Sequence, residues 1–145
     1  MNLSNYFVTA ALNAAFRGVV VTWPDTVYLA LYTSNPTAAD TGQEVTAGEY
    51  ERQEITFGAP APENYILYNL ITGVQSSVQR LTIKNTGDVV APVAESNWGT
   101  ITHIGIRDAA NGGNLWAFGA LDNARSILVN DVFKILSGEI QIEIG

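Results

Sequence analysis

Short strand-like segments separated by turn residues fill the chain from Val27 onward, and this pattern restricts the fold more than any other feature. Val27–Thr33 (VYLALYT) carries apolar side chains on both faces, which is typical of a strand buried on both sides. Glu139–Ile144 instead alternates polar residues with isoleucine, as expected for a strand with one solvated face. Roughly eight strands with turns about 8–12 residues apart predict a mainly β fold, an antiparallel β-sandwich or jelly-roll-like domain.

The clearest strand pair flanks the glycine-bearing loop 108–113. Trp98–Arg107 and Leu115–Leu121 lie on either side of this loop and predict a β-hairpin. Gly105 and Gly119 lie inside the two strands, where glycine weakens a strand unless a neighbour needs the space. We therefore expect an aromatic ring or the backbone to approach closely at these glycines, or a bulge to bend the sheet there.

Two further hairpins are predicted from turn residues between strand-like segments. Val78–Lys84 is followed by a polar turn and then by Val89–Val93. Asp131–Leu136 and Glu139–Ile144 lie on either side of a short Ser-Gly turn. We expect the two segments of each pair to form adjacent antiparallel strands.

The middle of the chain combines loop and edge-strand signals. Ser34–Gly48 is polar and contains several turn dipeptides, which predicts a long exposed loop. Glu49–Phe57 is typical of a polar strand at the edge of a sheet, ended by a break at Pro60 and Pro62. Tyr65–Leu70 fits a short strand or a helical turn.

The start of the chain predicts one α-helix over residues 4–17. Ser4 is a suitable N-cap, and Gly18 is placed to end the helix in the left-handed conformation. Apolar residues recur at helical spacing and form a wide stripe. Such a stripe ordinarily packs against the body of its own domain, and docking onto another subunit or a capsid is the alternative.

Length and composition indicate a folded single domain. The chain has 145 residues, of which 47% are hydrophobic and 14% charged, and a chain of this size folds without disulfides. We expect one domain over 1–145, with the helix at 4–17 and the β-sandwich at 27–144. The start lacks the basic region of a secretory signal, and the apolar runs fall short of the roughly 20 residues of a membrane span. We expect synthesis in a cytoplasm and no membrane partner.

The composition also excludes several kinds of chemistry. The chain has no cysteine, so it forms no disulfide, thiolate zinc site or iron–sulfur cluster. The single histidine, His103, excludes a metal site built from several imidazoles of one chain. Seven basic against fourteen acidic residues give a net charge of −7, which disfavours nucleic acid as a partner.

Few candidates for catalysis or metal binding remain. His103 lies in a strand-like segment, and the chain has no Gly-x-Ser-x-Gly elbow, so we interpret this histidine as structural. The acidic residues lack the spacing of a calcium loop, and Asn111-Gly112-Gly113 lacks the Lys-Ser/Thr of a phosphate-binding loop. The acidic residues considered are Glu49, Glu51, Glu54, Asp122 and Asp131. We predict no catalytic residue, no cofactor and no metal, and hence no enzyme.

Aromatic residues offer one further possibility, a stacking platform for sugars or bases. At strand spacing, large rings more often fill the core. The residues considered are Trp98, Trp116, Tyr28, Tyr32, Phe118 and Tyr50. A carbohydrate-binding module that uses the tryptophans stays open as an alternative.

Two blocks of the sequence resemble a family of small virion structural proteins of tailed bacteriophages. The block at 27–57 reads VYLALYTSNPTAADTGQEVTAGEYERQEITF, and the block at 97–121 reads NWGTITHIGIRDAANGGNLWAFGAL. The family has a similar ALYT…P…G.EV..G.Y.R..ITF block before a WG.ITH.GI.DA..GGNL...G.L block, and this pattern brings no catalytic residues. The resemblance implies that the matching positions are fold-determining turns and core contacts. These positions are Tyr50, Arg52, Trp98, His103, Gly105, Asp108, Gly112, Gly113 and Gly119.

The resemblance implies a structural role in the virion. Members look like head decoration (cement) proteins or are described as tail-fibre components. We expect an oligomeric decoration protein, synthesised in the host cytoplasm, that binds and stabilises the major capsid protein on the capsid exterior. The alternative is a tail-fibre or baseplate component, whose partners are tail proteins. In both cases we expect a homo-oligomer, because many modest contacts between copies add up to a stable assembly.

Overall fold

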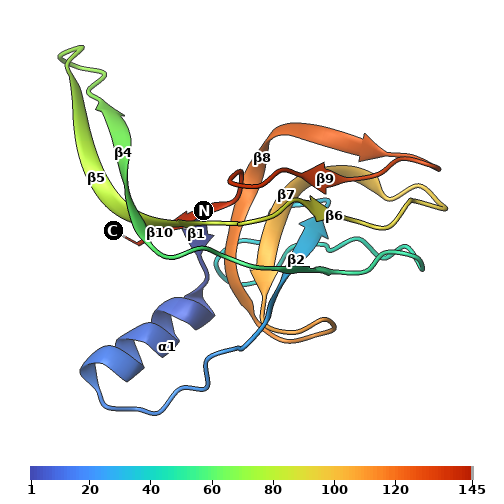
Figure 1. Cartoon of the computed structure of the whole chain (residues 1–145), viewed down its shortest axis with the longest axis horizontal. Coiled ribbons are helices and arrows are strands. Elements are labelled where there is room, and N and C mark those ends of the chain that lie inside the picture. The colour runs from blue at the N-terminus through green and yellow to red at the C-terminus, as the bar shows by residue number, and fades with distance from the viewer. Residues whose placement is uncertain (145) are drawn as a thin grey trace.

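Antiparallel pairing of the strand-like segments produces three sheets in the computed structural model, which describes residues 1–144 (Figure 1). The largest sheet has five strands in the order β1-β8-β7-β2-β3. These strands are β1 (Asn2–Leu3), β2 (Val27–Tyr32), β3 (Gln53–Ile55), β7 (Gly99–Arg107) and β8 (Leu115–Ile127). The predicted mainly β, antiparallel fold with one N-terminal helix is confirmed, and the finer jelly-roll interpretation stays a prediction.

Two smaller sheets complete the strand arrangement. The first has the order β10-β5-β4, and the second pairs β6 with β9. Their strands are β4 (Ala61–Tyr68), β5 (Gln75–Lys84), β6 (Val89–Val90), β9 (Lys134–Ile135) and β10 (Gln141–Glu143). Figure 1 shows β4 and β5 leaving the body of the molecule as a long curved hairpin.

The predicted hairpin around loop 108–113 is confirmed by β7 and β8. β8 runs to Ile127, six residues beyond its predicted end at Leu121. A Cβ on Gly105 would lie 2.8 Å from Cε2 of Tyr32 and from Cδ1 of Leu115. The predicted close approach of an aromatic ring is therefore confirmed at Gly105, where a larger residue would overpack the core.

β2 has the position predicted for a strand buried on both sides. It pairs with β3 on one side and with β7 on the other. Its last four residues are all buried, with Leu29 and Leu31 on one face and Ala30 and Tyr32 on the other. β3 lies at the sheet edge, as predicted, but spans three residues rather than the whole of Glu49–Phe57.

The two other predicted hairpins are wrong. Val78–Lys84 lies in β5, which pairs with β4 and β10. β6, in the segment Val89–Val93, pairs with β9 instead. The C-terminal segments Asp131–Leu136 and Glu139–Ile144 therefore contribute strands to two different sheets.

Asn85 explains this change of partners. Its side chain is 2% exposed, and Nδ2 donates to the carbonyl oxygens of Gly87 and Leu136 at 2.8 and 3.1 Å. Its Oδ1 accepts a 2.9 Å bond from the backbone N–H of Ile140. A buried amide must satisfy its polar atoms, and here it does so by fixing the turn after β5 against the C-terminal segment.

The middle of the chain differs from the prediction at its prolines. Pro62 lies inside β4, opposite Leu81, rather than in a break between elements. β4 is an edge strand that pairs only with β5. No strand lies on its other edge, so a proline without an N–H group leaves no inter-strand hydrogen bond unmade there. The strand interpretation of Tyr65–Leu70 is correct as far as Tyr68. The loop 34–48 is largely surface, with Val45 buried.

The predicted N-terminal helix is confirmed as α1 (Asn5–Phe16). The hydroxyl oxygen of Ser4 accepts a 3.0 Å bond from the N–H of Phe7 and donates to the carbonyl of Leu115 at 2.5 Å. Gly18 follows the helix with a φ of +65°, as expected for a residue that ends a helix. Ser4 thus caps the helix and also ties it to the start of β8.

The hydrophobic core lies between the large sheet and the segments that carry β6, β9 and β10. Its buried residues are Leu29, Leu31, Val45, Ile55, Val89, Ala91, Ala94, Trp98, Ile101, Ile104, Ile106, Ala117, Ile127, Phe133, Ile135 and Ile140. Neither α1 nor the β4–β5 hairpin contributes to this cluster. Figure 1 shows both elements projecting from the same end of the body, in diverging directions.

Candidate functional site

The β4–β5 hairpin forms the first candidate interaction surface. Eight cross-strand pairs, from Ala61–Thr82 to Tyr68–Gln75, hold its two strands together. The turn is closed by Asn69, whose Oδ1 accepts bonds from the N–H groups of Ile71 and Thr72 at 2.9 and 3.1 Å. We call the distal part of the hairpin, residues 64–79, the arm.

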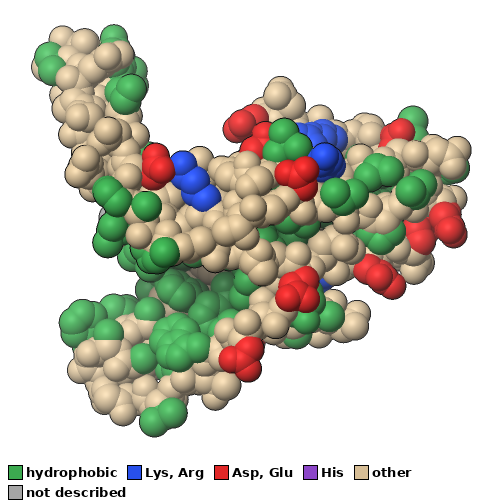
Figure 2. All heavy atoms as spheres, in the orientation of Figure 1, with side chains coloured by type: hydrophobic (Ala, Val, Ile, Leu, Met, Phe, Trp, Pro, Cys, Tyr) green, Lys and Arg blue, Asp and Glu red, His purple; other side chains and the backbone are tan. Residues whose placement is uncertain are grey.

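The arm exposes apolar side chains on both faces and at its tip. Ile66 and Leu67 are neighbours in β4, so they point to opposite faces of the ribbon. The exposed apolar residues are Ile66, Leu67, Tyr68, Leu70, Ile71 and Val74, and Leu70 and Ile71 are 88% and 95% exposed. The arm contains no charged residue, and Figure 2 shows charged side chains only at its base.

The second candidate surface is formed by α1 and the segment that follows it. We call this the helix surface, and its exposed apolar residues are Tyr6, Val8, Leu12, Phe16, Val19, Val20 and Trp23. Phe16 and Val20 are 82% and 94% exposed, and Ala10 is the one buried residue of α1. The stripe predicted from the sequence is therefore largely uncovered by the body. Figure 2 shows hydrophobic side chains over this region and a hollow between it and the base of the arm.

An aromatic cluster attaches the helix surface to the body. Phe7 lies 5.4 Å from Trp116 and 6.4 Å from Trp23, measured between ring centroids. Trp23 and Trp116 are 5.7 Å apart, and Tyr6 meets Trp116 edge-on. Rings in these tilted geometries attract one another beyond the area that they bury. The cluster therefore fixes α1 while leaving Trp23 half-exposed.

The tryptophans considered as a stacking platform are buried instead. Trp98 and Trp116 are 4% and 8% exposed. Their ring nitrogens donate to carboxylates, Trp98 to Glu49 at 2.8 Å and Trp116 to Asp108 at 3.0 Å. The accessible tryptophan is Trp23, which the strand pattern missed because it lies outside any strand, directly before a proline.

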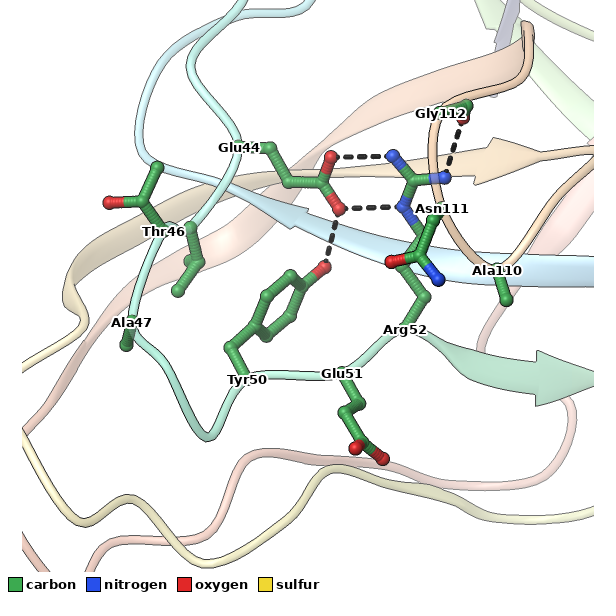
Figure 3. A pocket seen from close by; sticks show the side chains of 10 residues that line it. Glu44, Thr46, Ala47, Tyr50, Glu51, Arg52, Ala110, Asn111 and Gly112 are labelled. Atoms are coloured by element: carbon green, nitrogen blue, oxygen red, sulfur yellow. Dashed lines mark hydrogen bonds and ion pairs between the residues drawn. The ribbon is translucent and has the colours of Figure 1, made fainter.

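A polar cavity of about 380 Å³ lies between the loop 44–52 and the loop 110–112 (Figure 3). Arg52 forms its wall: Nε and Nη2 each donate a 2.7 Å bond to the Glu44 carboxylate. Its Nη1 donates to the carbonyl oxygens of Ala109 and Gly112, both at 2.7 Å. The contact with Glu44 raises the pKa of the Arg52 guanidinium. Most of the polar atoms of Arg52 are therefore already used within the chain.

Tyr50 extends the same network toward β2. Its hydroxyl donates to Glu44 Oε1 at 2.9 Å and accepts the N–H of Leu31 at 2.9 Å. Burial raises the pKa of the Tyr50 hydroxyl far above its ordinary value, so it is a neutral donor at physiological pH. The cavity wall thus joins the loop 44–52 to the central strand.

Arg107 holds the same glycine loop from the other side. Its Nη1 donates to Tyr32 and Asp40 at 2.9 and 2.8 Å, and its Nη2 donates to Asp40 and to the carbonyl of Gly113 at 2.9 and 2.8 Å. Burial works against the charge of Arg107, but the hydrogen bonds that Arg107 donates to Asp40 and Tyr32 outweigh this effect and raise the pKa of the guanidinium. Gly112 and Gly113 have φ values of +62° and +68°, so the loop requires glycine at both positions.

Asp108 closes this loop onto β8. It accepts bonds from the N–H of Asn114 at 2.6 Å and from the indole of Trp116. Partial burial raises its pKa, but these hydrogen bonds prevail and hold it below the usual value. Five positions that match the phage family therefore take part in the bonds that fix these loops, in agreement with the fold-determining role that the resemblance implies. They are Tyr50, Arg52, Asp108, Gly112 and Gly113.

The other candidate residues are not assembled into a reactive site. His103 pairs with Tyr32 and Ala120 within the sheet, and its Nδ1 lies 2.8 Å from the hydroxyl of Thr102. Glu49 contacts the segment 95–98, and Asp131 accepts the N–H of Leu128.

Two kinds of site are not found over residues 1–144. No group of three His, Cys, Asp or Glu side chains is placed to hold a metal ion there. In the same part of the chain, no helix has the length and apolarity needed to cross a membrane.

Comparison with known proteins gives one family. A family model described as podophage GP4 fiber I protein gp80 matches residues 2–143, which is nearly the whole chain. No curated protein matches the chain.

Proposed function

This chain belongs to the podophage GP4 fiber I protein family, and from that membership we propose that it is a structural component of the virion's tail fibres. Membership makes the chain a structural protein of a tailed-phage virion and agrees with the resemblance of the blocks at 27–57 and 97–121. The single observation behind the choice of fibre is the family match over residues 2–143, because its description names a fibre.

The exposed surfaces support an assembly role. The arm and the helix surface present large apolar side chains to solvent, such as Ile71 at 95% and Phe16 at 82% exposure. Contiguous exposed apolar surface in a folded protein typically marks a place of contact with another protein. We propose that these surfaces are covered when the chain is built into the virion.

The polar clusters support a structural rather than an enzymatic role. The side chains of Glu44, Arg52 and Arg107 bond to one another's loops and to the backbone of the chain itself. We propose that the protein is not an enzyme and that its cavity beside Arg52 is a by-product of loop fixation.

The family description favours the fibre over capsid decoration, which was the leading interpretation of the sequence. A decoration protein would bind the major capsid protein over the whole shell, and a fibre component would bind tail proteins at one vertex. Burial of Trp98 and Trp116 also weakens the carbohydrate-binding alternative, because a sugar cannot stack on a covered ring.

Labelling of intact virions tests the proposal. Antibody fragments raised against the folded chain are added to the virions that contain it, and the particles are imaged by electron microscopy. Label on fibres at the tail supports the proposal. Label spread over the capsid faces would overturn it in favour of decoration, and particles without label would contradict both.

A further inference from the structure

The arm and the helix surface are unpartnered in one chain and are separated from each other. Figure 1 shows the arm and α1 leaving the same end of the body, the arm upward and α1 downward. The tip residues Leu70 and Ile71 are 88% and 95% exposed, and Phe16 and Val20 on the helix surface are 82% and 94% exposed. Neither surface therefore covers the other within the chain.

The total accessible surface indicates that a partner is missing. The chain exposes 8544 Å², whereas a globular monomer of this mass exposes about 7,200 Å². The excess of about 1,300 Å² exceeds the roughly 800 Å² that one protein contributes to a standard interface. The two projecting elements carry highly exposed apolar residues, with Phe16, Val20, Leu70 and Ile71 all more than four-fifths exposed.

The geometry of the arm points in the same direction. Beyond the three residues that pair with β10, β5 has β4 as its sole strand partner among the described residues. A two-stranded ribbon is marginally stable in water unless one face packs against something else. Both faces of the arm carry exposed apolar side chains, here Ile66 and Leu67, so packing against a partner would stabilise it.

The distribution of charge indicates the nature of the partner. The chain carries a net charge of −7, but residues 64–79 contain no charged side chain and residues 1–24 contain one, that of Arg17. Copies of an acidic protein repel one another through their charged surfaces. The arm and the helix surface are the places where two copies can meet without that repulsion, and interface cores are typically depleted in charge.

We propose that the arm of one copy packs against the helix surface of a neighbouring copy. Each contact of this kind covers the arm of one copy and the helix surface of its neighbour. Pairing of two arms would instead leave every helix surface exposed. The contact joins unlike patches, so it is head-to-tail, and repetition closes a ring if the rotation between copies allows it. The proposal concerns contacts between copies and goes beyond the assignment to the tail fibre.

Complementation between two full-length variants tests this pairing. The arm variant carries Leu70→Gln and Ile71→Gln, and the helix variant carries Phe16→Gln and Val20→Gln. All four side chains are more than four-fifths exposed, so the variants should keep the circular dichroism spectrum and melting temperature of the wild type. Light scattering after size exclusion measures the mass of each protein and of an equimolar mixture.

The proposal requires a specific pattern of masses. The wild type should form oligomers, and each variant alone should lose this association by at least about tenfold in Kd, which is about 1.4 kcal/mol. The helix variant keeps an intact arm, and the arm variant keeps an intact helix surface. The mixture should therefore contain dimers of one arm variant with one helix variant. A control with Leu128→Gln and Val129→Gln, which are 54% and 50% exposed on the body, should assemble like the wild type.

Three results would overturn the proposal. The first is a wild type that stays monomeric up to about 1 mM, where even contacts with a Kd near 1 mM are visible. The second is a helix variant that assembles as well as the wild type, which would indicate pairing of arms. The third is a mixture in which both variants stay monomeric. Each result is independent of where antibody label falls on the virion, so the two proposals fail separately.

Discussion

The indole nitrogen of Trp98 donates a 2.8 Å hydrogen bond to Oε1 of Glu49. The same oxygen accepts bonds from the backbone N–H groups of Glu95 and Ser96, both at 2.9 Å, and from the hydroxyl of Ser96 at 2.8 Å. These bonds, with the indole contact as the largest influence, lower the pKa of Glu49 from 4.5 to about 2. One carboxylate therefore fixes the segment that precedes β7.

Glu49→Gln should lower the melting temperature at pH 7 and change its acid dependence. Because the pKa of Glu49 is lower in the folded state, its ionised form stabilises the fold above pH 4.5, and this stabilisation disappears as the pH falls toward about 2. The variant should therefore lose less stability than the wild type over that range. Circular dichroism melting at several pH values measures both effects, and the exposed neighbour Glu51→Gln is the control. An unchanged acid dependence in Glu49→Gln would contradict the assignment.

Two ion pairs of different burial should contribute unequally to stability. The side chain of Arg52 is 7% exposed and pairs with Glu44, whereas that of Lys84 is 37% exposed and pairs with Glu63. Arg52→Ala should reduce the free energy of unfolding by about 3 kcal/mol, because Glu44 and two loop carbonyls lose their donor. Lys84→Ala should cost less than about 1 kcal/mol. Urea unfolding compares the two, and equal losses would show that the cavity wall is not a stabilising clamp.

Gly105→Ala should destabilise the fold by about 1–3 kcal/mol. The added methyl group would lie 2.8 Å from both the Tyr32 ring and the Leu115 side chain, inside the core. Gly87→Ala is a matched control, because its Cβ meets nothing within 4 Å, and it should change the free energy of unfolding by less than about 0.5 kcal/mol. Denaturant unfolding of the two variants measures the difference, and a tolerated Gly105→Ala would show that Tyr32 moves aside.

Trp23 should account for most of the quenchable tryptophan fluorescence. It is 49% exposed, whereas Trp98 and Trp116 are 4% and 8% exposed. Acrylamide should quench the wild-type emission clearly and the emission of Trp23→Phe weakly, because a collisional quencher must reach the ring. Equal quenching constants for the two proteins would indicate that the buried rings are reached by opening of the fold.

Local signals explain why part of the fold can be predicted from the sequence. Ser4 and Gly18 mark the two ends of α1 by local means: the Ser4 hydroxyl accepts the N–H of Phe7, and Gly18 has the positive φ that ends a helix. The β7–β8 hairpin follows equally from its two strands and the short glycine loop 108–113 between them. The close approach at Gly105 is a long-range feature that could also be predicted, because glycine inside a strand has few explanations.

The remaining strand pairs depend on contacts that no local pattern encodes. Asn85 bonds to Leu136 and Ile140, more than fifty residues away, and thereby sends β5 and β6 to different partners. A single asparagine in a turn has the same local appearance whether or not it is buried. For this reason the turn after β5 predicts a hairpin that does not form.

The interaction surfaces could be predicted in part. The wide apolar stripe of α1 indicates a surface with room for a partner, and the structure leaves that stripe largely exposed. The arm could not be recognised, because Tyr65–Leu70 is apolar and apolar residues ordinarily predict burial. Residues 64–79 contain no charged residue. This feature of the sequence indicates an interaction surface only once the segment is known to project from the body.

The uncharged arm has a consequence for the conditions that a free virion meets. Attraction between apolar side chains does not depend on counterions, and excluded salts such as sulfate strengthen it, whereas cooling weakens it. The contact through residues 64–79 is therefore expected to change little when salt is diluted away, although the repulsion between the acidic bodies grows as screening falls. Cooling weakens the contact itself, so a fibre built in this way is expected to loosen at low temperature.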